Sequence, residues 1–282
     1  MKLVIDISYY QGFTETQWDL LATVLDGVII RMGYGLNEDS AAKKHILSAV
    51  KRNIPYSGYH WVDITTPRDR QINYMKDIIK RLEPRSYFLD FEQYWTDWEA
   101  YMSGNYAKAY ETRQTPEQIN TFNYNTYLGM SNSEVPVGVY CADWFIGERD
   151  GSGKLVRGYA PEMKGWVLYS DYWEALYLRY SNPQWWEGKQ IELGKNFPIR
   201  EMKELAEQIA IPNGIGRQFE SYIEVGGLNP HLDWNVFTDV GFNKMFAIEE
   251  PVEIPDQTLQ ERLMRPRLKH GRRSLRNRIR KW

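Results

Sequence analysis

The segment YFLDFE at residues 87–92 ends in two carboxylates separated by one residue, Asp90 and Glu92. Its apolar start predicts a β-strand, and side chains alternate across a strand. The two acids therefore share one face, about 6.5–7 Å apart along the chain, while Leu89 and Phe91 face the packing helices. Such a pair can divide acid and electrostatic roles, because crowded like charges raise the pKa of one member. Strand position alone is equally consistent with a solvated strand end whose acids pair with Arg or Lys.

Two further acids lie near predicted strand ends. Asp6 closes an apolar run at residues 3–8, and Asp233 follows 216–220, the last strand that we predict. In a barrel of parallel strands, side chains at the carboxyl ends meet at one face. Glycoside hydrolysis needs a protonated carboxyl for the leaving oxygen and an ionised one that supports positive charge at the anomeric carbon. The candidate catalytic residues are Asp6, Asp90, Glu92 and Asp233.

The elements that must position these acids alternate between strand and helix patterns. The predicted strands are residues 3–8, 27–32, 55–62, 87–92, 135–142, 166–170 and 216–220, and the predicted helices are 16–24, 41–52, 70–82, 116–128 and 200–209. Strands alternating with helices imply parallel pairing with right-handed crossovers. Seven or eight strands in about 240 residues favour a closed sheet. We therefore predict an α/β fold, a single modified TIM-like (β/α) barrel.

Three segments depart from a minimal barrel. Residues 93–114 and 171–195 are rich in Trp and Tyr and are predicted as long excursions over the barrel mouth. Residues 249–282 begin as an acidic, proline-flanked linker and become basic from Arg262 to Lys281; they hold 10 Lys and Arg against 5 Asp and Glu. We place the domain boundary near residue 248, with a catalytic barrel at 1–248 and a linker with a basic tail at 249–282.

Composition argues against several other classes of protein. The single cysteine, Cys141, lies in an apolar run and is predicted to be a buried thiol, so no disulfide forms within the chain. The four histidines show no ligand spacing with one another or with Cys141, and we predict no metal and no cofactor. No stretch approaches the roughly 18 apolar residues of a membrane-spanning helix. The 11 Trp and 20 Tyr leave two explanations open, an aromatic core or a groove that binds sugars or nucleobases.

Five short motifs, in order along residues 3–237, resemble the glycoside hydrolase family 25 lysozymes. Residues 6–12 (DISYYQG) resemble the family's D-x-S-x-x-Q-G opening, 58–61 (GYHW) its third-strand G-x-Y-H-F/W, and 89–92 (LDFE) its L-D-x-E. Residues 139–145, with Tyr140, Trp144 and Phe145, resemble its fifth-strand segment. Gln218 and Phe219, followed by 232–237 (LDWNVF), resemble the closing Q-Y…V-D-x-N-x-F.

This resemblance implies hydrolysis of the β-1,4 bond between N-acetylmuramic acid and N-acetylglucosamine in bacterial peptidoglycan. Glu92 then corresponds to the general acid, and Asp6, Asp90 and Asp233 to supporting carboxylates. Asp90 either orients the substrate's N-acetyl group as an internal nucleophile or stabilises the oxocarbenium-like ion. The candidates for the sugar cleft are Tyr59, His60, Trp61, Tyr140, Trp166 and Gln218, although the aromatic ones are equally consistent with core positions.

The sequence also departs from the family pattern. Residues 31–35 read RMGYG where the family has a Thr-Glu-Gly-like segment, and Arg217 replaces the Trp that commonly precedes the closing Gln-Tyr. Because all four acids are present, we expect activity. The departures and the two excursions bear on which sugars the cleft accepts.

The N-terminus lacks the pattern of a secretory signal. A lysozyme-like enzyme of this kind resembles a bacteriophage lysin, held in the host cytoplasm until a holin releases it or carried on the virion tail, and acting on the cell wall. The basic tail is either a solvated segment or an attachment to anionic wall polymer, a membrane surface or phage structural proteins. Nucleic-acid binding lacks a recognisable module. Two alternatives remain open: a structural or binding component of a phage particle with little activity, and a metal-dependent hydrolase.

Overall fold

The computed structural model describes residues 1–142, 148–149, 155–157, 177–180, 198–209, 211, 215–220, 228 and 232–246. Several predictions fall outside the described residues. They are the strand at 166–170 with Trp166, the motif residues Trp144 and Phe145, the domain boundary near residue 248 and the basic tail.

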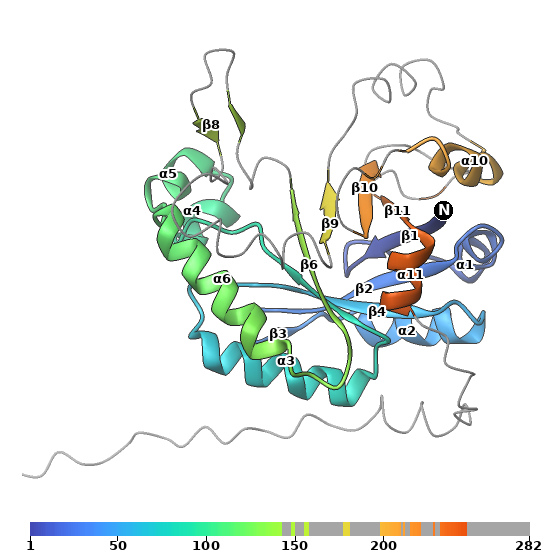
Figure 1. Cartoon of the computed structure of the whole chain (residues 1–282), viewed down its shortest axis with the longest axis horizontal. Coiled ribbons are helices and arrows are strands. Elements are labelled where there is room, and N and C mark those ends of the chain that lie inside the picture. The colour runs from blue at the N-terminus through green and yellow to red at the C-terminus, as the bar shows by residue number, and fades with distance from the viewer. Residues whose placement is uncertain are drawn as a thin grey trace, which may run out of the picture.

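Eight of the described strands close into a barrel (Figure 1). They are β1 (Lys2–Ile7), β2 (Gly27–Tyr34), β4 (Tyr56–Trp61), β5 (Tyr87–Asp90), β6 (Val137–Ala142), β9 (Tyr177–Tyr180), β10 (Gly216–Glu220) and β11 (Asp233–Phe237). Neighbours in this list are hydrogen-bonded, and β1 pairs with both β2 and β11, which completes the ring. The short β3 (Asn37–Glu38) extends β2 as a hairpin, and β7 (Glu148–Arg149) with β8 (Leu155–Arg157) forms a separate two-stranded sheet. The predicted barrel is confirmed.

Two strands correct the sequence prediction. β9 belongs to the barrel and pairs in parallel with β6 and β10, so the segment 171–195 is not wholly an excursion. Among the described strands, β11 and not the strand at 216–220 is the last, and it runs antiparallel to both β1 and β10. Asp233 therefore begins a strand instead of following one. Because β11 is reversed, its first residue lies beside the carboxyl ends of the parallel strands.

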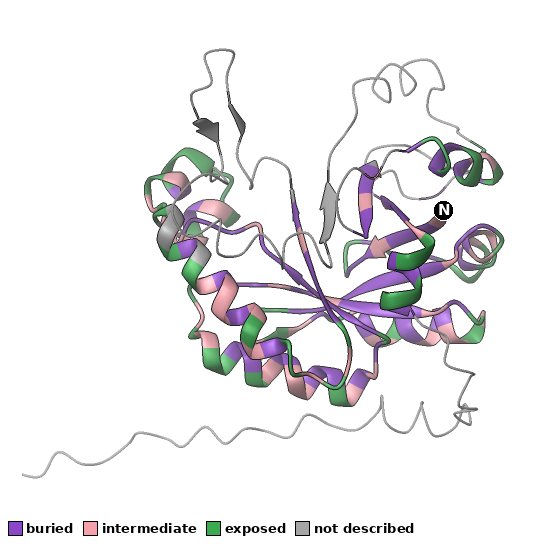
Figure 2. Ribbon diagram, in the orientation of Figure 1, coloured by how far each residue is buried: buried purple, intermediate pink, exposed green. Residues whose placement is uncertain are grey.

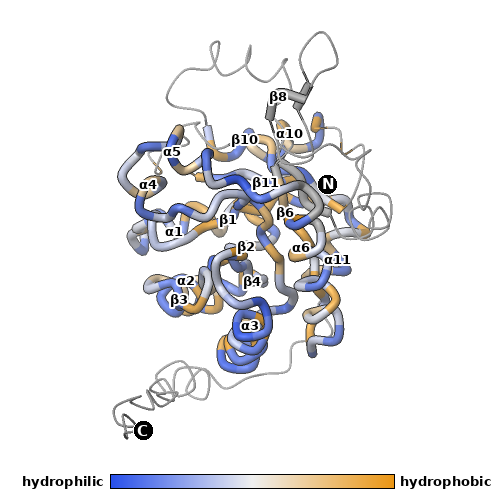
Figure 3. Tube along the Cα trace, turned by 90° about the vertical axis from the view of Figure 1, so that its left-hand side faces the viewer, coloured by the Kyte–Doolittle hydropathy of each residue, from blue (hydrophilic) through white to orange (hydrophobic). Residues whose placement is uncertain are grey.

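Helices pack on the outside of the barrel near the predicted positions. They are α1 (Glu15–Ala22), α2 (Ala42–Lys51), α3 (Arg68–Leu82), α6 (Pro116–Met130), and the short η2 (Ile199–Glu201) with α10 (Met202–Ala206). Thr14 forms a capping box at the start of α1, and Thr115 forms one at the start of α6. The inner faces of the helices are buried and the outer faces exposed (Figure 2), and apolar and polar residues alternate along the turns of α2 (Figure 3). Two further helices, α4 (Trp98–Met102) and α5 (Tyr106–Glu111), lie in the predicted excursion at 93–114.

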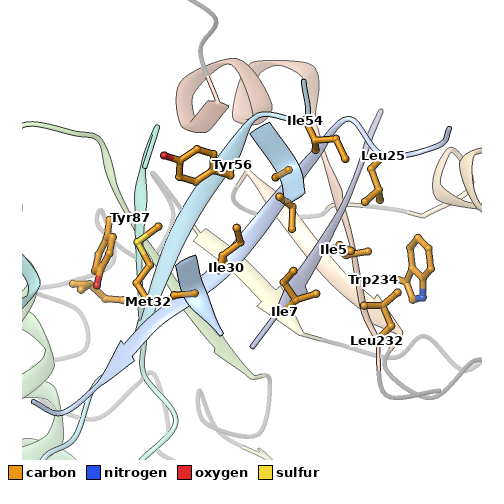
Figure 4. Packing of buried hydrophobic residues seen from close by; sticks show 14 of the residues in the cluster. Ile5, Ile7, Leu25, Ile30, Met32, Ile54, Tyr56, Tyr87, Leu232 and Trp234 are labelled. Atoms are coloured by element: carbon orange, nitrogen blue, oxygen red, sulfur yellow. The ribbon is translucent and has the colours of Figure 1, made fainter. Parts of the chain in front are cut away.

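The strands separate two hydrophobic cores. Residues at alternate positions, among them Ile5, Ile7, Ile30, Met32 and Trp234, pack between the barrel and the helices (Figure 4). The intervening residues Val4, Ile29 and Phe88 face the interior, where they join Phe242, Met245 and Phe246 of α11 (Asp239–Phe246). Leu89 and Phe91 lie in the outer core, as predicted.

The last helix of the described residues, α11, closes the amino-terminal end of the barrel. A Cβ atom at Gly27, the first residue of β2, would lie 2.8 Å from the Phe246 ring. Ser57, near the start of β4, donates a hydrogen bond from Oγ to the carbonyl oxygen of Met245 at 3.1 Å. This end of the barrel is filled with aromatic side chains.

Cys141 is buried, as predicted. Among the residues that the structure describes, no helix is both long and apolar enough to cross a membrane.

Candidate active site

The carboxyl ends of the barrel strands surround a pocket of about 710 Å³, with the open space at its mouth included. It is lined by Asp6, Ser8, Tyr10, Gln11, Ile29, Arg31, Tyr59, Trp61, Phe88, Asp90, Glu92, Tyr140, Gln218 and Asp233. All four candidate catalytic acids are in this set, although they come from three separate parts of the chain.

The strand register explains how the acids meet. Asp6 of β1 is paired with Asp233 of β11 across the barrel wall. Asp90, at the end of β5, has Trp61 of β4 on one side and Tyr140 of β6 on the other. Glu92 follows Asp90 by two residues and lines the same pocket. Asp6, Asp90 and Asp233 therefore face inward because of their positions in strands, whereas Glu92 lies just past β5, which ends two residues before the predicted end of this strand. The pocket gathers four acidic groups.

This crowding changes how the acids hold protons. Burial raises the pKa of Glu92 to about 7, and the charge of Asp6 adds to that effect. Burial also raises the pKa of Asp6 to about 6, although hydrogen bonds from Asn235 and with Asp233 and the charge of Arg31 lower it. The pKa of Asp90 is raised well above its ordinary value by burial and by the charges of Glu92 and Asp6. The pocket therefore retains protons near neutral pH, as acid catalysis requires.

Hydrogen bonds in the pocket are unevenly distributed. Asn235 of β11 donates from Nδ2 to Asp6 Oδ2 at 2.8 Å. Within the described part of the chain, the buried atoms Asp90 Oδ1 and Asn235 Oδ1 have no hydrogen-bond partner. A buried polar atom without a partner is unusual in folded proteins and often marks a site that a ligand completes.

The polar and aromatic candidates separate into two groups. Tyr59, Trp61, Tyr140 and Gln218 line the pocket, where ring faces and an amide can contact a sugar. Trp61 also donates from Nε1 to Gln93 Oε1 at 3.4 Å, which connects the pocket wall to the segment after β5. Burial raises the pKa of both Tyr59 and Tyr140 well above the ordinary value, so their hydroxyls stay neutral.

His60 does not line the pocket. It is fully buried, its Nε2 lies 3.1 Å from the Gly35 carbonyl oxygen, and its Nδ1 lies 3.4 Å from the Tyr87 hydroxyl. Burial lowers the pKa of His60 to about 4, so the ring is neutral at physiological pH. We therefore do not place His60 among the residues that contact a substrate. Trp166 lies outside the described residues.

Several residues that line the pocket are not among the site residues predicted from the sequence. Arg31 is the most informative, because it interrupts the buried run GVIIRM at 27–32 and shares the inward face of Ile29. A charge inside an otherwise apolar strand is a signal that could have found it. Ser8, Tyr10 and Gln11 lie in the loop after β1 and line the pocket. Ser8 and Gln11 occupy fixed positions of the D-x-S-x-x-Q-G motif, which is the signal that could have found them. Among the described residues, no group of three or more His, Cys, Asp or Glu is placed to hold a metal ion.

No family model matches the sequence, and no curated protein matches it either. Solved structures do match in fold. The catalytic domain of endolysin ply40, from bacteriophage P40 of Listeria monocytogenes, aligns over 87% of this chain and 97% of its own, with 17% identity and a TM-score of 0.53.

Two further structures match similarly. GHIP, a glycosyl hydrolase 25 of Streptococcus pneumoniae, aligns over 87% of this chain and 92% of its own, with 17% identity and a TM-score of 0.53. A muramidase from Trichobolus zukalii aligns over 87% of this chain and 99% of its own, with 13% identity and a TM-score of 0.53. The chain therefore has the barrel fold of these three proteins, and its carboxylate pocket lies at the carboxyl end of that barrel.

Proposed function

We propose that the protein is a muramidase, a glycoside hydrolase that cleaves the β-1,4 bond between N-acetylmuramic acid and N-acetylglucosamine in bacterial peptidoglycan. The observation that carries this proposal is the convergence of Asp6, Asp90, Glu92 and Asp233 in one pocket, with the pKa of Glu92 raised to about 7. The five sequence motifs and the fold shared with an endolysin, a glycosyl hydrolase 25 and a muramidase support the same reaction.

In the proposed reaction, Glu92 is the general acid. Its carboxyl donates a proton to the glycosidic oxygen while the bond from that oxygen to the anomeric carbon breaks, and the electron pair leaves with the oxygen. Positive charge develops on the anomeric carbon and the ring oxygen, and the ionised carboxylates of the pocket support it. A water molecule then bonds to the anomeric carbon and returns a proton to Glu92.

Asp90 has two possible roles in this scheme. Its unpartnered Oδ1 can accept a hydrogen bond from the substrate's N-acetyl group and orient that group as an internal nucleophile. Alternatively, the carboxylate faces the oxocarbenium-like ion directly. Glycan from which the N-acetyl groups have been removed separates the two roles, because only the first requires that group.

We also propose that the enzyme is a bacteriophage lysin that acts on the host cell wall, either freed by a holin or carried on the virion. The fold shared with a bacteriophage endolysin domain supports this origin. In this setting, the basic tail attaches the enzyme to anionic wall polymer or to phage structural proteins. The presence of all four acids in the pocket argues against a barrel kept only for a structural role.

The proposal is tested with purified protein on peptidoglycan. We expect new reducing ends that carry N-acetylmuramic acid, identified by mass analysis of the products. Glu92→Gln removes the acidic proton and is expected to lower the rate by a factor of about 10² to 10⁴. Glu207→Gln, a change at an exposed residue outside the pocket, should leave the rate unchanged.

Wild-type protein that releases no reducing ends from several chemically distinct walls would overturn the proposal. Activity that survives a metal chelator would exclude the metal-dependent alternative.

A further inference from the structure

The acid-lined pocket also contains a permanent positive charge. Arg31 lies on β2 two residues beyond Ile29, which is paired with Asp6, so it is displaced toward the barrel mouth by about 6.5–7 Å along the strand. Among the described residues that line the pocket, it is the one cationic side chain. Only 8% of Arg31 is exposed. A buried cation in this position needs a specific explanation.

One ion pair holds the inner edge of the guanidinium. Arg31 donates from Nε to Asp39 Oδ2 at 2.7 Å. Asp39 is itself fixed by the backbone N–H groups of Tyr9 at 3.1 Å and Ala41 at 2.9 Å. Within the described part of the chain, Nη2 is buried without a hydrogen-bond partner. A guanidinium has five N–H donors, and among the described residues the two on Nη2 have no partner.

Three tyrosine rings fix the plane of the same group. The ring centroids of Tyr9, Tyr10 and Tyr34 lie 4.8, 5.4 and 5.8 Å from Arg31 Cζ, within the range of cation–π contact. Tyr10 also lines the pocket, and 63% of its surface is exposed. The guanidinium is therefore already ordered at the rim of the pocket, and a ligand that binds it does not have to immobilise it.

We propose that Arg31 binds a carboxylate of the glycan substrate and so selects acidic wall polymer over neutral, chitin-like glycan. This inference rests on the proposed muramidase function. A planar guanidinium matches a carboxylate through two parallel hydrogen bonds. The ionised acids of the pocket repel an anion, so Arg31 determines where an anionic substituent can lie.

The carboxylate can come from two parts of the substrate. N-acetylmuramic acid differs from N-acetylglucosamine by a lactyl ether that ends in a carboxyl group. In peptide-bearing wall, this group is amide-linked, and carboxylates of the peptide stem remain free. Both sources offer the same chemistry to Arg31, and the experiment separates them.

The test compares three glycans of equal length. The first is free of peptide and has free lactyl carboxylates, the second is the same glycan with these groups converted to methyl amides, and the third retains its peptide stems. Cleavage is measured as kcat/KM. Binding is measured by calorimetry in a Glu92→Gln background, in which the glycan survives.

The test variant removes the positive charge of Arg31 without leaving the Asp39 carboxylate unpaired. Because the Asp39 side chain is fully buried, Arg31→Gln alone would leave the Asp39 carboxylate buried without a cationic partner. The double variant Arg31→Gln with Asp39→Asn replaces the ion pair by neutral groups that can still bond to each other. Arg31→Lys keeps the charge but loses the planar pair of donors, and it serves if the double variant does not fold. The matched control is Arg81→Gln, which alters a partly buried arginine bound to Asp77 and Glu38 outside the pocket.

We expect the wild type and Arg81→Gln to prefer the free carboxylates to the methyl amides by roughly tenfold or more, and the double variant to lose this preference. Arg31→Lys should retain part of it. A preference that appears only with peptide stems, and disappears in the double variant, assigns the carboxylate to the peptide. The inference is overturned if the double variant keeps the wild-type ratios of kcat/KM among all three glycans. If the double variant does not fold, the same result with Arg31→Lys overturns it. Arg31-dependent binding without any cleavage by the wild type would contradict the proposed function alone.

Discussion

The proton on Glu92 depends on neighbours that are distant in the chain. Burial and the charge of Asp6 raise its pKa, while Asp6 is in turn held by Asn235 through a hydrogen bond of 2.8 Å. Since Asp6 has a pKa of about 6 and Glu92 one of about 7, the two groups define a narrow range in which one is ionised and the other protonated. The activity is expected to be greatest in that range.

Asn235 provides a test of this coupling. Asn235→Ala removes a hydrogen bond that lowers the pKa of Asp6, so that pKa should rise further. The acid side of the profile of kcat/KM against pH should then move to higher pH, with a loss of about tenfold at pH 6. The control is Asn123→Ala, which alters an equally buried asparagine on α6 and should cost stability without moving the profile. An unchanged acid side in Asn235→Ala would show that this hydrogen bond does not tune Asp6.

At the scale of elements, the strands that bring the acids together differ in how well the sequence predicts them. β2 and β5 begin where the sequence predicts, because each opens with apolar residues that are buried on both faces. β11 reads DWNVF, in which Asp233, Asn235 and Phe237 face the barrel interior, while Trp234 and Val236 lie in the outer core. Its pattern lacks an apolar run, so the sequence does not predict it as a strand. The sequence does not predict β9 either, because it lies within an aromatic-rich segment that resembles a loop.

The sequence predicts only part of the candidate site. Asp6, Asp90, Glu92 and Asp233 could be selected from the sequence because strand ends and family motifs both point to them. Local patterns did not distinguish Tyr59 and Trp61, which line the pocket, from His60, which lies between them in sequence and is buried on the other face. The alternation along β4 explains this difference only once the inward face is known.

The helix that closes the barrel floor gives an element-scale prediction. A Cβ atom at Gly241 of α11 would collide with the backbone carbonyl oxygen of Ile215, which cannot move aside as a side chain can. Gly241→Ala should therefore destabilise the protein by about 1–3 kcal/mol, measured by denaturant unfolding. Val240→Ala is the control, because this neighbouring side chain is 67% exposed and should change stability little. Equal stability of the two variants would mean that α11 is not seated on the barrel as described.

At the scale of the whole molecule, the pocket that supplies acid catalysis makes stability depend on pH. A carboxyl whose pKa is raised on folding holds its proton more tightly in the folded state. Its contribution is fully present below the unfolded pKa and is lost as the pH rises through the folded value. For Glu92 this window extends from 4.5 to about 7, and for Asp6 from 3.8 to about 6.

Glu92→Gln should therefore stabilise the protein more at pH 8 than at pH 4, and thermal unfolding at both values measures the difference. Each pKa unit corresponds to about 1.4 kcal/mol, and because Glu92 retains some exposure in the pocket, we expect a gain on the order of 1–2 kcal/mol at pH 8. Glu15→Gln is a control of opposite sign, since hydrogen bonds from Lys51 and Arg52 lower the pKa of this surface residue. A Glu92→Gln variant whose relative stability does not change with pH would contradict the assignment of a raised pKa.

The most direct measurement of the central claim is a carbon-13 NMR titration of the Glu92 side-chain carboxyl in the folded, ligand-free protein, assigned by comparison with Glu92→Gln. We predict a midpoint near 7, which falls in Asp6→Asn because the charge of Asp6 contributes to the shift. A midpoint near the ordinary value of 4.5, with no response to Asp6→Asn, would mean that the pocket does not hold a protonated acid near neutral pH.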